Sequence, residues 1–109
     1  MRPDLLGKRV LVVGLGLTGR SMVRWLVARG AVVSAADSRA EPPGLAELRA
    51  AFPQVPVTTG PFRGENFADV DMLAVSPGVP LAEPGIARAV RAGVPVAGTY
   101  LGLAGQAAV

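Results

Sequence analysis

The sequence predicts an α/β domain with a doubly wound, mainly parallel sheet of five strands in the order 3-2-1-4-5. Short apolar runs alternate with helical patterns along the chain, which is typical of this class. A glycine-rich turn joins the first run to the first helical pattern. Apolar residues make up 50% of the 109 positions, and aromatic residues only 5%. A core of Val, Leu and Ala suits a sheet that is buried on both faces.

The first half begins with a strand, a helix and a second strand. Residues 8–13 form a short apolar run that ends at Gly14, which indicates a buried strand. A helix is predicted from about Thr18 to Arg29. Gly30 stands where a glycine commonly ends a helix, and residues 31–36 give the second strand. One face of the predicted helix carries Val23, Leu26, Val27 and Gly30.

The middle of the chain supplies one more helix and one more strand. Residues 41–44 contain two prolines and a glycine, which indicates a turn. A helix from Leu45 to Phe52 and a short strand over residues 55–59 follow. We expect a loop through Pro61 and Gly64 before the next strand.

The last part repeats the strand-and-helix pattern. Residues 71–75 predict a strand that ends at Ser76-Pro77-Gly78. Pro84 begins a helix that continues to Gly93, because a proline costs nothing in the first turn. Residues 94–96 predict a fifth strand, and its proline favours the edge of the sheet. The tail over 98–109 is small and apolar and is not assigned to an element.

The turn Gly14-Leu15-Gly16-Leu17-Thr18-Gly19 has the spacing of a Rossmann-like nucleotide-binding turn. Gly14 would allow the tight turn, Gly16 the approach of a diphosphate, and Gly19 the packing of the helix on the strand. Asp37 stands 18 positions after Gly19, near the spacing of about 20 expected of that fingerprint. The alternatives are that the glycines serve packing alone and that Asp37 is an ordinary turn carboxylate.

Ligands of open α/β sheets bind at the carboxyl ends of the strands, where the strand order reverses. With the predicted order, that crevice lies between the first and fourth strands. We expect it to be lined by residues 14–18, 37–39 and 76–78. The alternatives are that Ser76-Pro77-Gly78 is a rigid connecting turn and that Arg39 is a solvated surface charge.

Composition excludes several kinds of site and partner. The chain has no cysteine and no histidine, so neither a disulfide nor a thiolate or imidazole metal site is expected. The net charge of +3 comes from 11 basic and 8 acidic residues. The basic residues are scattered singly, which argues against a nucleic-acid surface.

No apolar run reaches the roughly 20 residues that span a bilayer, and the amino terminus lacks a secretion signal. We therefore expect no membrane partner and a cytoplasmic protein.

The glycine turn, Asp37-Ser38-Arg39, Pro42-Pro43-Gly44-Leu45 and Ser76-Pro77-Gly78 occur in an order that resembles the Mur ligases of peptidoglycan synthesis. Among them the likeness is to the amino-terminal domain of the ligases that add D-glutamate, and it covers nearly the whole chain. The resemblance implies a domain that binds the UDP part of UDP-N-acetylmuramoyl-L-alanine. It also implies that the full enzyme uses ATP and Mg²⁺ to form an acyl-phosphate, which D-glutamate attacks.

The resemblance carries over to particular residues. Leu17 and Thr18 would contact the diphosphate, and Ser76 with Gly78 would form the opposite wall. Gly16 and Pro77 complete the set of residues assigned to the UDP site. The resemblance assigns the uracil and its ribose to Asp37, Ser38 and Arg39.

Two departures from the family pattern stand out. Residues 98–103 occupy the place where related ligases usually carry an acidic residue, so no ligand contact is assigned to them. The P-loop pattern G-x-x-x-x-G-K-[ST] is absent from the sequence.

The leading hypothesis is therefore that residues 1–109 form one UDP-substrate-binding domain of a three-domain ligase. On this hypothesis the chain holds no catalytic residue, metal or cofactor of its own and is inactive by itself. Its partners are the substrate and the remaining domains of the same ligase, and it is a monomer. The alternatives are the NAD-binding domain of an oxidoreductase and a regulatory nucleotide-sensing module.

Overall fold

The computed structural model describes residues 5–98 and contains one parallel sheet of five strands in the order β3-β2-β1-β4-β5. The strands are β1 (Arg9–Val13), β2 (Val32–Asp37), β3 (Val57–Thr59), β4 (Met72–Val75) and β5 (Val96–Gly98). The helices are α1 (Leu17–Ala28), α2 (Leu45–Ala51) and α3 (Pro84–Arg91), with a short 3-10 helix η1 (Gly64–Phe67). The predicted fold class and strand order are both confirmed.

Strand β1 lies in the middle of the sheet and pairs with β2 on one side and β4 on the other. Its last residue, Val13, is in register with Ala36 of β2 and Val75 of β4. The chain moves outward to β2 and β3 and then returns to the other side of β1 for β4 and β5. The strand order therefore reverses between β1 and β4, and the turns that follow these two strands diverge and leave a crevice.

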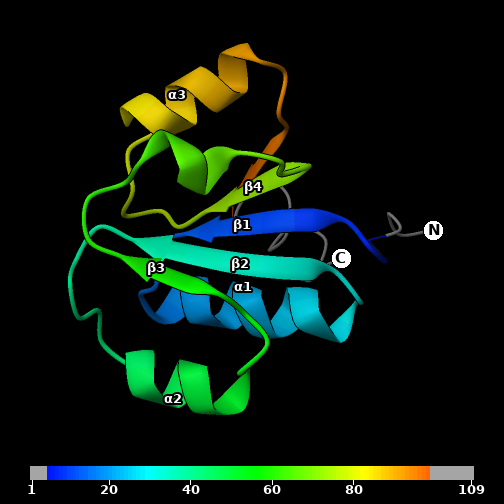
Figure 1. Cartoon of the computed structure of the whole chain (residues 1–109), viewed down its shortest axis with the longest axis vertical. Helices are drawn as coiled ribbons and strands as arrows, with labels where there is room; N and C mark the ends of the chain where they lie inside the picture. The colour runs from blue at the N-terminus through cyan, green and yellow to red at the C-terminus, as the bar shows by residue number, and fades with distance from the viewer. Residues whose placement is uncertain (1–4, 99–109) are drawn as a thin grey trace.

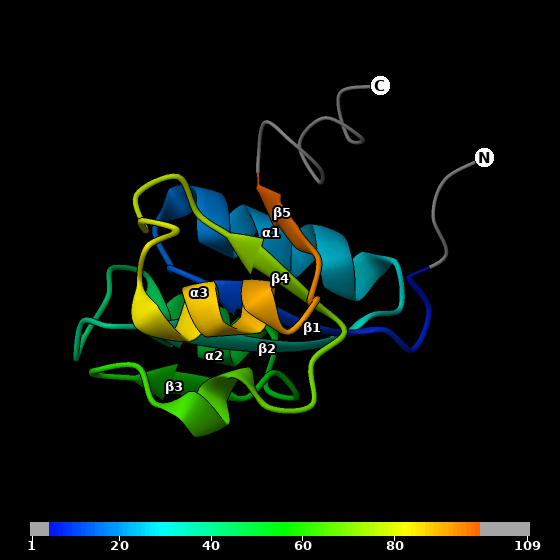
Figure 2. The ribbon, with the colours of Figure 1, turned by 90° about the horizontal axis from the view of Figure 1, so that it is seen from above.

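The sheet is covered on both faces. Helices α1 and α2 lie on one face, and α3 and η1 lie on the other (Figure 1). The view from above shows the same arrangement, with α1 and α3 on opposite sides of the strands (Figure 2). Successive side chains of β1 therefore enter two different cores. Val10 and Val12 pack toward α1, whereas Leu11 and Val13 pack toward α3.

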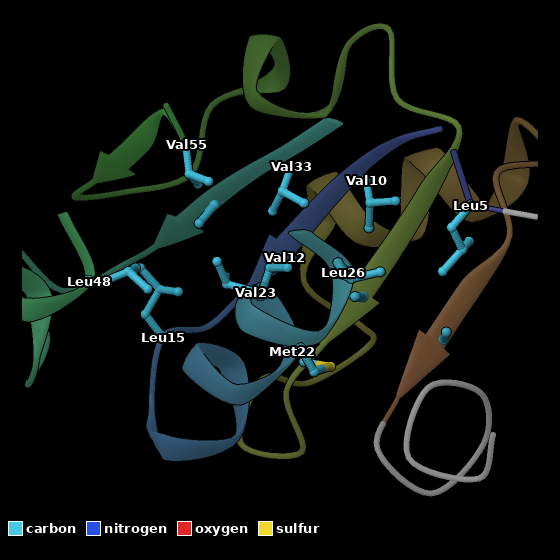
Figure 3. Close-up of a cluster of buried hydrophobic side chains, with 13 residues drawn as sticks. Leu5, Val10, Val12, Leu15, Met22, Val23, Leu26, Val33, Leu48 and Val55 are labelled. Atoms are coloured by element: carbon cyan, nitrogen blue, oxygen red, sulfur yellow. The ribbon is translucent and has the colours of Figure 1, made fainter. Parts of the chain in front are cut away.

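The larger core is formed by aliphatic side chains from α1, β1, β2 and the segment around α2 (Figure 3). On α1 the buried residues are Gly19, Met22, Val23 and Leu26. The apolar face predicted from the sequence thus starts one turn earlier than expected, because Gly19 already lies against β1. Gly30 has φ +81° and follows the last turn, as predicted.

The structure differs from the prediction mainly at the sheet edges. The loop expected after β3 contains η1, whose Phe67 packs against α3 and thereby orders the segment. The fifth strand begins at Val96 rather than at residue 94, and it does lie at the edge. Gly98, assigned to the tail, is its last residue, and residues 99–109 lie outside the described part. Strand β3 begins at Val57, two residues later than expected.

None of the helices formed by residues 5–98 has the length and apolarity that crossing a membrane would require.

Candidate functional site: a crevice at the carboxyl ends of the strands

A pocket of about 530 Å³ lies at the carboxyl ends of β1, β2 and β4. It contains all nine residues that the sequence assigned to UDP binding. They are Gly16, Leu17, Thr18, Asp37, Ser38, Arg39, Ser76, Pro77 and Gly78. The structure therefore brings the three separated motifs together in one crevice, while their contact with UDP stays a prediction.

The glycine turn between β1 and α1 is fixed by its own geometry. Gly14 has φ +92°, a conformation that side chains other than glycine rarely adopt. Its N–H donates to the carbonyl oxygen of Ala36 at 2.8 Å, which joins the turn to β2. A Cβ atom at Gly19 would overlap the carbonyl oxygen of Gly14. Gly14 and Gly19 are thus required by the fold, as the sequence predicted.

Gly16 and Gly78 differ from these two glycines. A Cβ atom at either position would meet nothing within 4 Å. Neither has a positive φ, and Gly16 has φ −71°, which other residues adopt readily. Both line the pocket. No described neighbour and no backbone constraint requires glycine at these two sites, so the open space beside them points to a ligand that approaches the backbone closely.

Helix α1 begins at the pocket without a side-chain cap. Its N-cap residue is Gly16, which has no side chain to accept from the first amide groups, and the first turn carries no acidic residue. Such amide groups, together with the helix dipole, favour an anion. Leu17 and Thr18 belong to this turn and line the pocket. Leu17 is 77% exposed.

Asp37 is the last residue of β2 and is only 3% exposed. Its Oδ2 accepts from Leu15 N–H at 2.7 Å and from Arg39 Nη2 at 2.7 Å. Its Oδ1 accepts from Arg39 N–H at 2.8 Å and from Arg39 Nε at 2.9 Å. The carboxylate thus already has four hydrogen bonds within the protein, which is its ordinary capacity.

These hydrogen bonds determine the ionisation of Asp37. The Arg39 guanidinium lowers the pKa of Asp37 to about 2 against an opposing effect of burial, and the Arg39 and Leu15 amides lower it further. The resemblance assigned Asp37 to the nucleoside, and that contact stays a prediction. In the structure its carboxylate holds Leu15 of the glycine turn and Arg39.

Arg39 is the only cationic residue among the described residues that line the pocket. Its side chain is 52% exposed, yet Asp37 holds its Nε and Nη2 atoms. This two-point contact fixes the plane of the guanidinium. Arg39 therefore presents an oriented cation to the crevice rather than a freely solvated charge.

Ser76 ties the opposite wall to the glycine turn. It is buried, and its Oγ donates to the carbonyl oxygen of Gly14 at 2.7 Å. Its N–H donates to Val13 at 2.9 Å, and its own carbonyl accepts from Val79 at 3.0 Å. The segment after β4 is therefore a braced wall of the crevice, rather than a connection independent of it.

Two residues that line the pocket were not predicted from the sequence. They are Phe62, in the loop after β3, and Val79, directly after Gly78. The signal for Phe62 was its place after the third strand, whose carboxyl end lies at the same sheet edge. No sequence signal marks Val79, because its place in the pocket depends on its packing against Gly14, where a Cβ atom on Gly14 would lie 2.7 Å from Val79 Cγ2.

A larger pocket, of about 660 Å³, lies elsewhere and shares no residue with the crevice. Its walls include Arg9, Ser34 and Asp69, toward the other end of the sheet. Its lining contains no glycine and no residue from the first turn of an α-helix. Size alone therefore does not identify the site, and we assign it from the position at the strand reversal and from the glycine turn.

Residues 8–98 match a protein family described as "Mur ligase MurD-like, N-terminal domain". The chain belongs to this Mur ligase family. The matched range includes every strand and helix described above and all three motifs of the crevice.

Curated relatives agree with this assignment to the Mur ligases. The chain is 54% identical over 95 residues to the UDP-N-acetylmuramoylalanine–D-glutamate ligase of Thiobacillus denitrificans, and 50% identical over 95 residues to that of Nitrosospira multiformis. Each match covers 87% of this chain and 20% of the relative. The chain therefore spans about a fifth of the length of these relatives.

Solved structures share the fold. The UDP-N-acetylmuramate-alanine ligase from Thermotoga maritima matches with a TM-score of 0.68 and 24% identity, over 83% of this chain and 20% of the other. The precorrin-2 dehydrogenase SirC matches with a TM-score of 0.56 and 23% identity, over 69% of this chain and 37% of the other. At these identities the matches show the α/β fold alone, which ligases and dehydrogenases share.

Proposed function

We propose that this chain binds the UDP part of UDP-N-acetylmuramoyl-L-alanine. We further propose that it is the amino-terminal domain of the cytoplasmic, ATP-dependent ligase that adds D-glutamate to this compound during peptidoglycan synthesis. The curated relatives carry the name of that ligase and are about half identical over the matched region. Fold alone would not distinguish this function from dinucleotide binding, so the proposal depends on the family and on the crevice.

The observation that carries the proposal is the open space at Gly16 and Gly78. Both glycines line one crevice, and no described contact or backbone angle requires either of them. Gly16 also begins α1, where uncapped amide groups favour an anion. A diphosphate placed against Gly16 would accept hydrogen bonds from the start of α1, with the Thr18 hydroxyl as a further donor.

The remaining parts of the ligand follow from the charges of the crevice. Asp37 and Arg39 are the charged residues among its described walls, and each neutralises the other. A diphosphate beside Asp37 is therefore repelled less than it would be by an unpaired carboxylate. The nucleoside would lie toward the ends of β2 and β3, where Ser38 and Arg39 offer polar contacts. The sugar and peptide of the substrate would leave the crevice toward other domains of the ligase.

The chemistry of the ligase belongs, on this proposal, to the rest of the enzyme. The sequence contains no P-loop pattern and no histidine. We therefore assign ATP and Mg²⁺ to other domains, and we assign substrate anchoring to this one. The role of this chain would be to hold the UDP end so that the distant carboxyl group of the substrate reaches the ATP site. Such anchoring contributes to catalysis by positioning rather than by acid or base chemistry.

A thermal-shift comparison of ligands tests the proposal. A ligand that binds only the folded chain stabilises it by about 2.7 kcal/mol at a concentration of 100 Kd. We expect UDP and UDP-N-acetylmuramoyl-L-alanine to raise the melting temperature at concentrations where NAD and NADP have no effect. If NAD raises it and the UDP compounds do not, the dinucleotide-binding alternative is correct.

A further inference from the structure

Phe62 lies where the structure provides an apolar wall for the crevice. It follows β3 by three residues, and the intervening turn is held to the end of β2 because Gly60 N–H donates to the carbonyl of Arg39 at 3.3 Å. Phe62 is the only aromatic residue among the described residues that line the pocket. It therefore lies on the same side of the crevice as the proposed nucleoside contacts.

The position of the Phe62 ring is fixed by a second aromatic residue. Phe62 and Phe67 meet edge to face, with ring centroids 6.0 Å apart and planes at 76°. Phe67 in turn lies on Gly85 of α3, where a Cβ atom would overlap its ring. Both phenylalanines pack against the core between the sheet and α3. Phe62 is thus half-buried, supported from the core, and in contact with the pocket from its other side.

A nucleoside diphosphate has two chemically different ends. Its diphosphate needs N–H donors, which α1 offers, and it gains nothing from an apolar ring. Its base is flat and has an aromatic face, which stacks well on a phenylalanine or on a guanidinium plane. Phe62 supplies an aromatic ring for such stacking, and Arg39 supplies a guanidinium whose plane is fixed by Asp37.

We infer that Phe62 is the wall against which the base of the bound nucleotide packs, with Phe67 as its support. This inference rests on the proposed function, because it assumes that a nucleoside diphosphate occupies the crevice. Phe62 would make the crevice select a diphosphate that carries a base over one that does not. Helix α3 contributes no residue to the pocket. It would nevertheless affect ligand selection, because Gly85 of α3 contacts Phe67 and Phe67 supports the ring of Phe62.

The test compares UDP with inorganic pyrophosphate on variants of the 109-residue chain, with binding followed by NMR titration. We expect Phe62→Ala to weaken UDP about ten-fold, in the range of a lost base–aromatic stack, and to change pyrophosphate by less than about two-fold. Phe62→Tyr keeps the ring and should keep most of the UDP affinity. Phe52→Leu is the matched control, because Phe52 is also half-buried but packs on the other core. It should lower stability without changing the affinity for UDP.

A second measurement is independent of affinity. Nuclear Overhauser contacts should connect the ring protons of Phe62 with the uracil protons of bound UDP. The inference is wrong if UDP binds a folded Phe62→Ala variant as well as it binds the unmodified chain. It is also wrong if UDP and pyrophosphate are weakened equally, since that indicates a structural role. Failure of the unmodified chain to bind UDP at all would instead overturn the proposed function, and this inference with it.

Discussion

Gly14, Gly16 and Gly19 belong to one turn, but different causes account for each. Gly14 is required by a positive φ, and Gly19 by the close approach of α1 to the carbonyl of Gly14. Gly16 has neither constraint, because a Cβ atom there would enter open space within the crevice. The sequence pattern does not distinguish the three glycines. The structure shows that the fold requires Gly14 and Gly19, whereas Gly16 leaves open space in the crevice.

Substitution with valine should distinguish the two kinds of glycine. Gly16→Val should cost up to about 1 kcal/mol of stability, since glycine is a better N-cap than valine, and the chain should still fold. Its branched side chain would fill the space of the diphosphate, so UDP binding should fall at least ten-fold, or about 1.4 kcal/mol. Gly19→Val should instead cost more than about 2 kcal/mol or prevent folding, because it overpacks the contact between α1 and β1. Urea unfolding and UDP titration of both variants measure these effects.

Uridine provides the control for Gly16→Val, because it lacks the diphosphate. It should bind the variant nearly as well as it binds the unmodified chain. Full UDP affinity in a folded Gly16→Val variant would show that no diphosphate lies against Gly16.

The hydrogen-bond partners of Asp37 are a feature of single residues that the sequence could not predict. The position of Asp37 at the end of the second strand followed from the pattern, and the structure places it there. The direction of its hydrogen bonds did not follow, because it depends on the rotamers of Asp37 and Arg39 and on the turn that brings Leu15 N–H near. Partners of a buried carboxylate are a property of three-dimensional packing, which spacing along the chain does not record.

At the scale of elements, the start of α3 depends on one side chain. Glu83 is the N-cap residue, and its Oε1 accepts from Gly85 N–H at 2.8 Å and from Ile86 N–H at 3.2 Å. Loss of an N-cap acceptor typically costs about 1 kcal/mol. We therefore expect Glu83→Ala to lower the free energy of unfolding by about that amount, measured by urea denaturation.

Two further variants make the N-cap test specific. Glu83→Gln keeps an acceptor oxygen and should recover most of the loss. Glu41→Ala removes an exposed glutamate before α2 and should change stability by less than about 0.5 kcal/mol. A loss as large in Glu83→Gln as in Glu83→Ala would mean that charge, rather than the cap hydrogen bond, stabilises α3.

The elements that the sequence predicted well are those with a strong period and a clear end. Helix α1 was predicted to within one residue at each end, because a glycine turn precedes it and Gly30 follows it. The edge strands were less accurate. Strands β3 and β5 have three residues each, and their limits depend on pairing with β2 and β4 rather than on local sequence. Element η1 was missed, since its order comes from the contact of Phe67 with α3.

At the scale of the whole molecule, the position of the crevice follows from the order of the strands more than from any single residue. Once the strands alternate with helices, the right-handed connections and the return past β1 place a crevice between β1 and β4. Three motifs far apart in sequence then meet, which is why nine residues that line the crevice could be named in advance, while their contact with a ligand stays a prediction. The apolar walls, Phe62 and Val79, depend on how the loops after β3 and β4 pack on the core, and no motif marks them.

The charges of the whole chain give a simple dependence of stability on pH. The chain has no histidine and no cysteine, so no side chain has an ordinary pKa between about 5 and 8. Among the described acidic residues, Asp37 and Asp71 have lowered pKa values, each because of an arginine, namely Arg39 and Arg9. The Arg9–Asp71 pair is exposed, and such pairs contribute little to stability. Asp37 is buried and should dominate.

The stability of the chain should therefore be flat from about pH 5 to 8 and fall in acid. The pKa of Asp37 is about 2 in the folded chain, against an ordinary value of 3.8, so between these values the unfolded chain binds more protons. The stabilisation is then complete above the unfolded pKa and is lost as the pH falls toward 2. Asp37→Asn removes the ionised acceptor and should cost on the order of 2 kcal/mol at pH 7, because a pKa of about 2 in place of 3.8 corresponds to roughly 2.5 kcal/mol. Urea unfolding of both chains from pH 7 to pH 2 measures the difference in stability, which should narrow as Asp37 becomes protonated.

Asp71→Asn is the matched control, and its stability should differ much less from that of the unmodified chain at every pH. A gap for Asp37→Asn that stays constant down to pH 2 would mean that the charge of Asp37 does not stabilise the turn between β1 and α1.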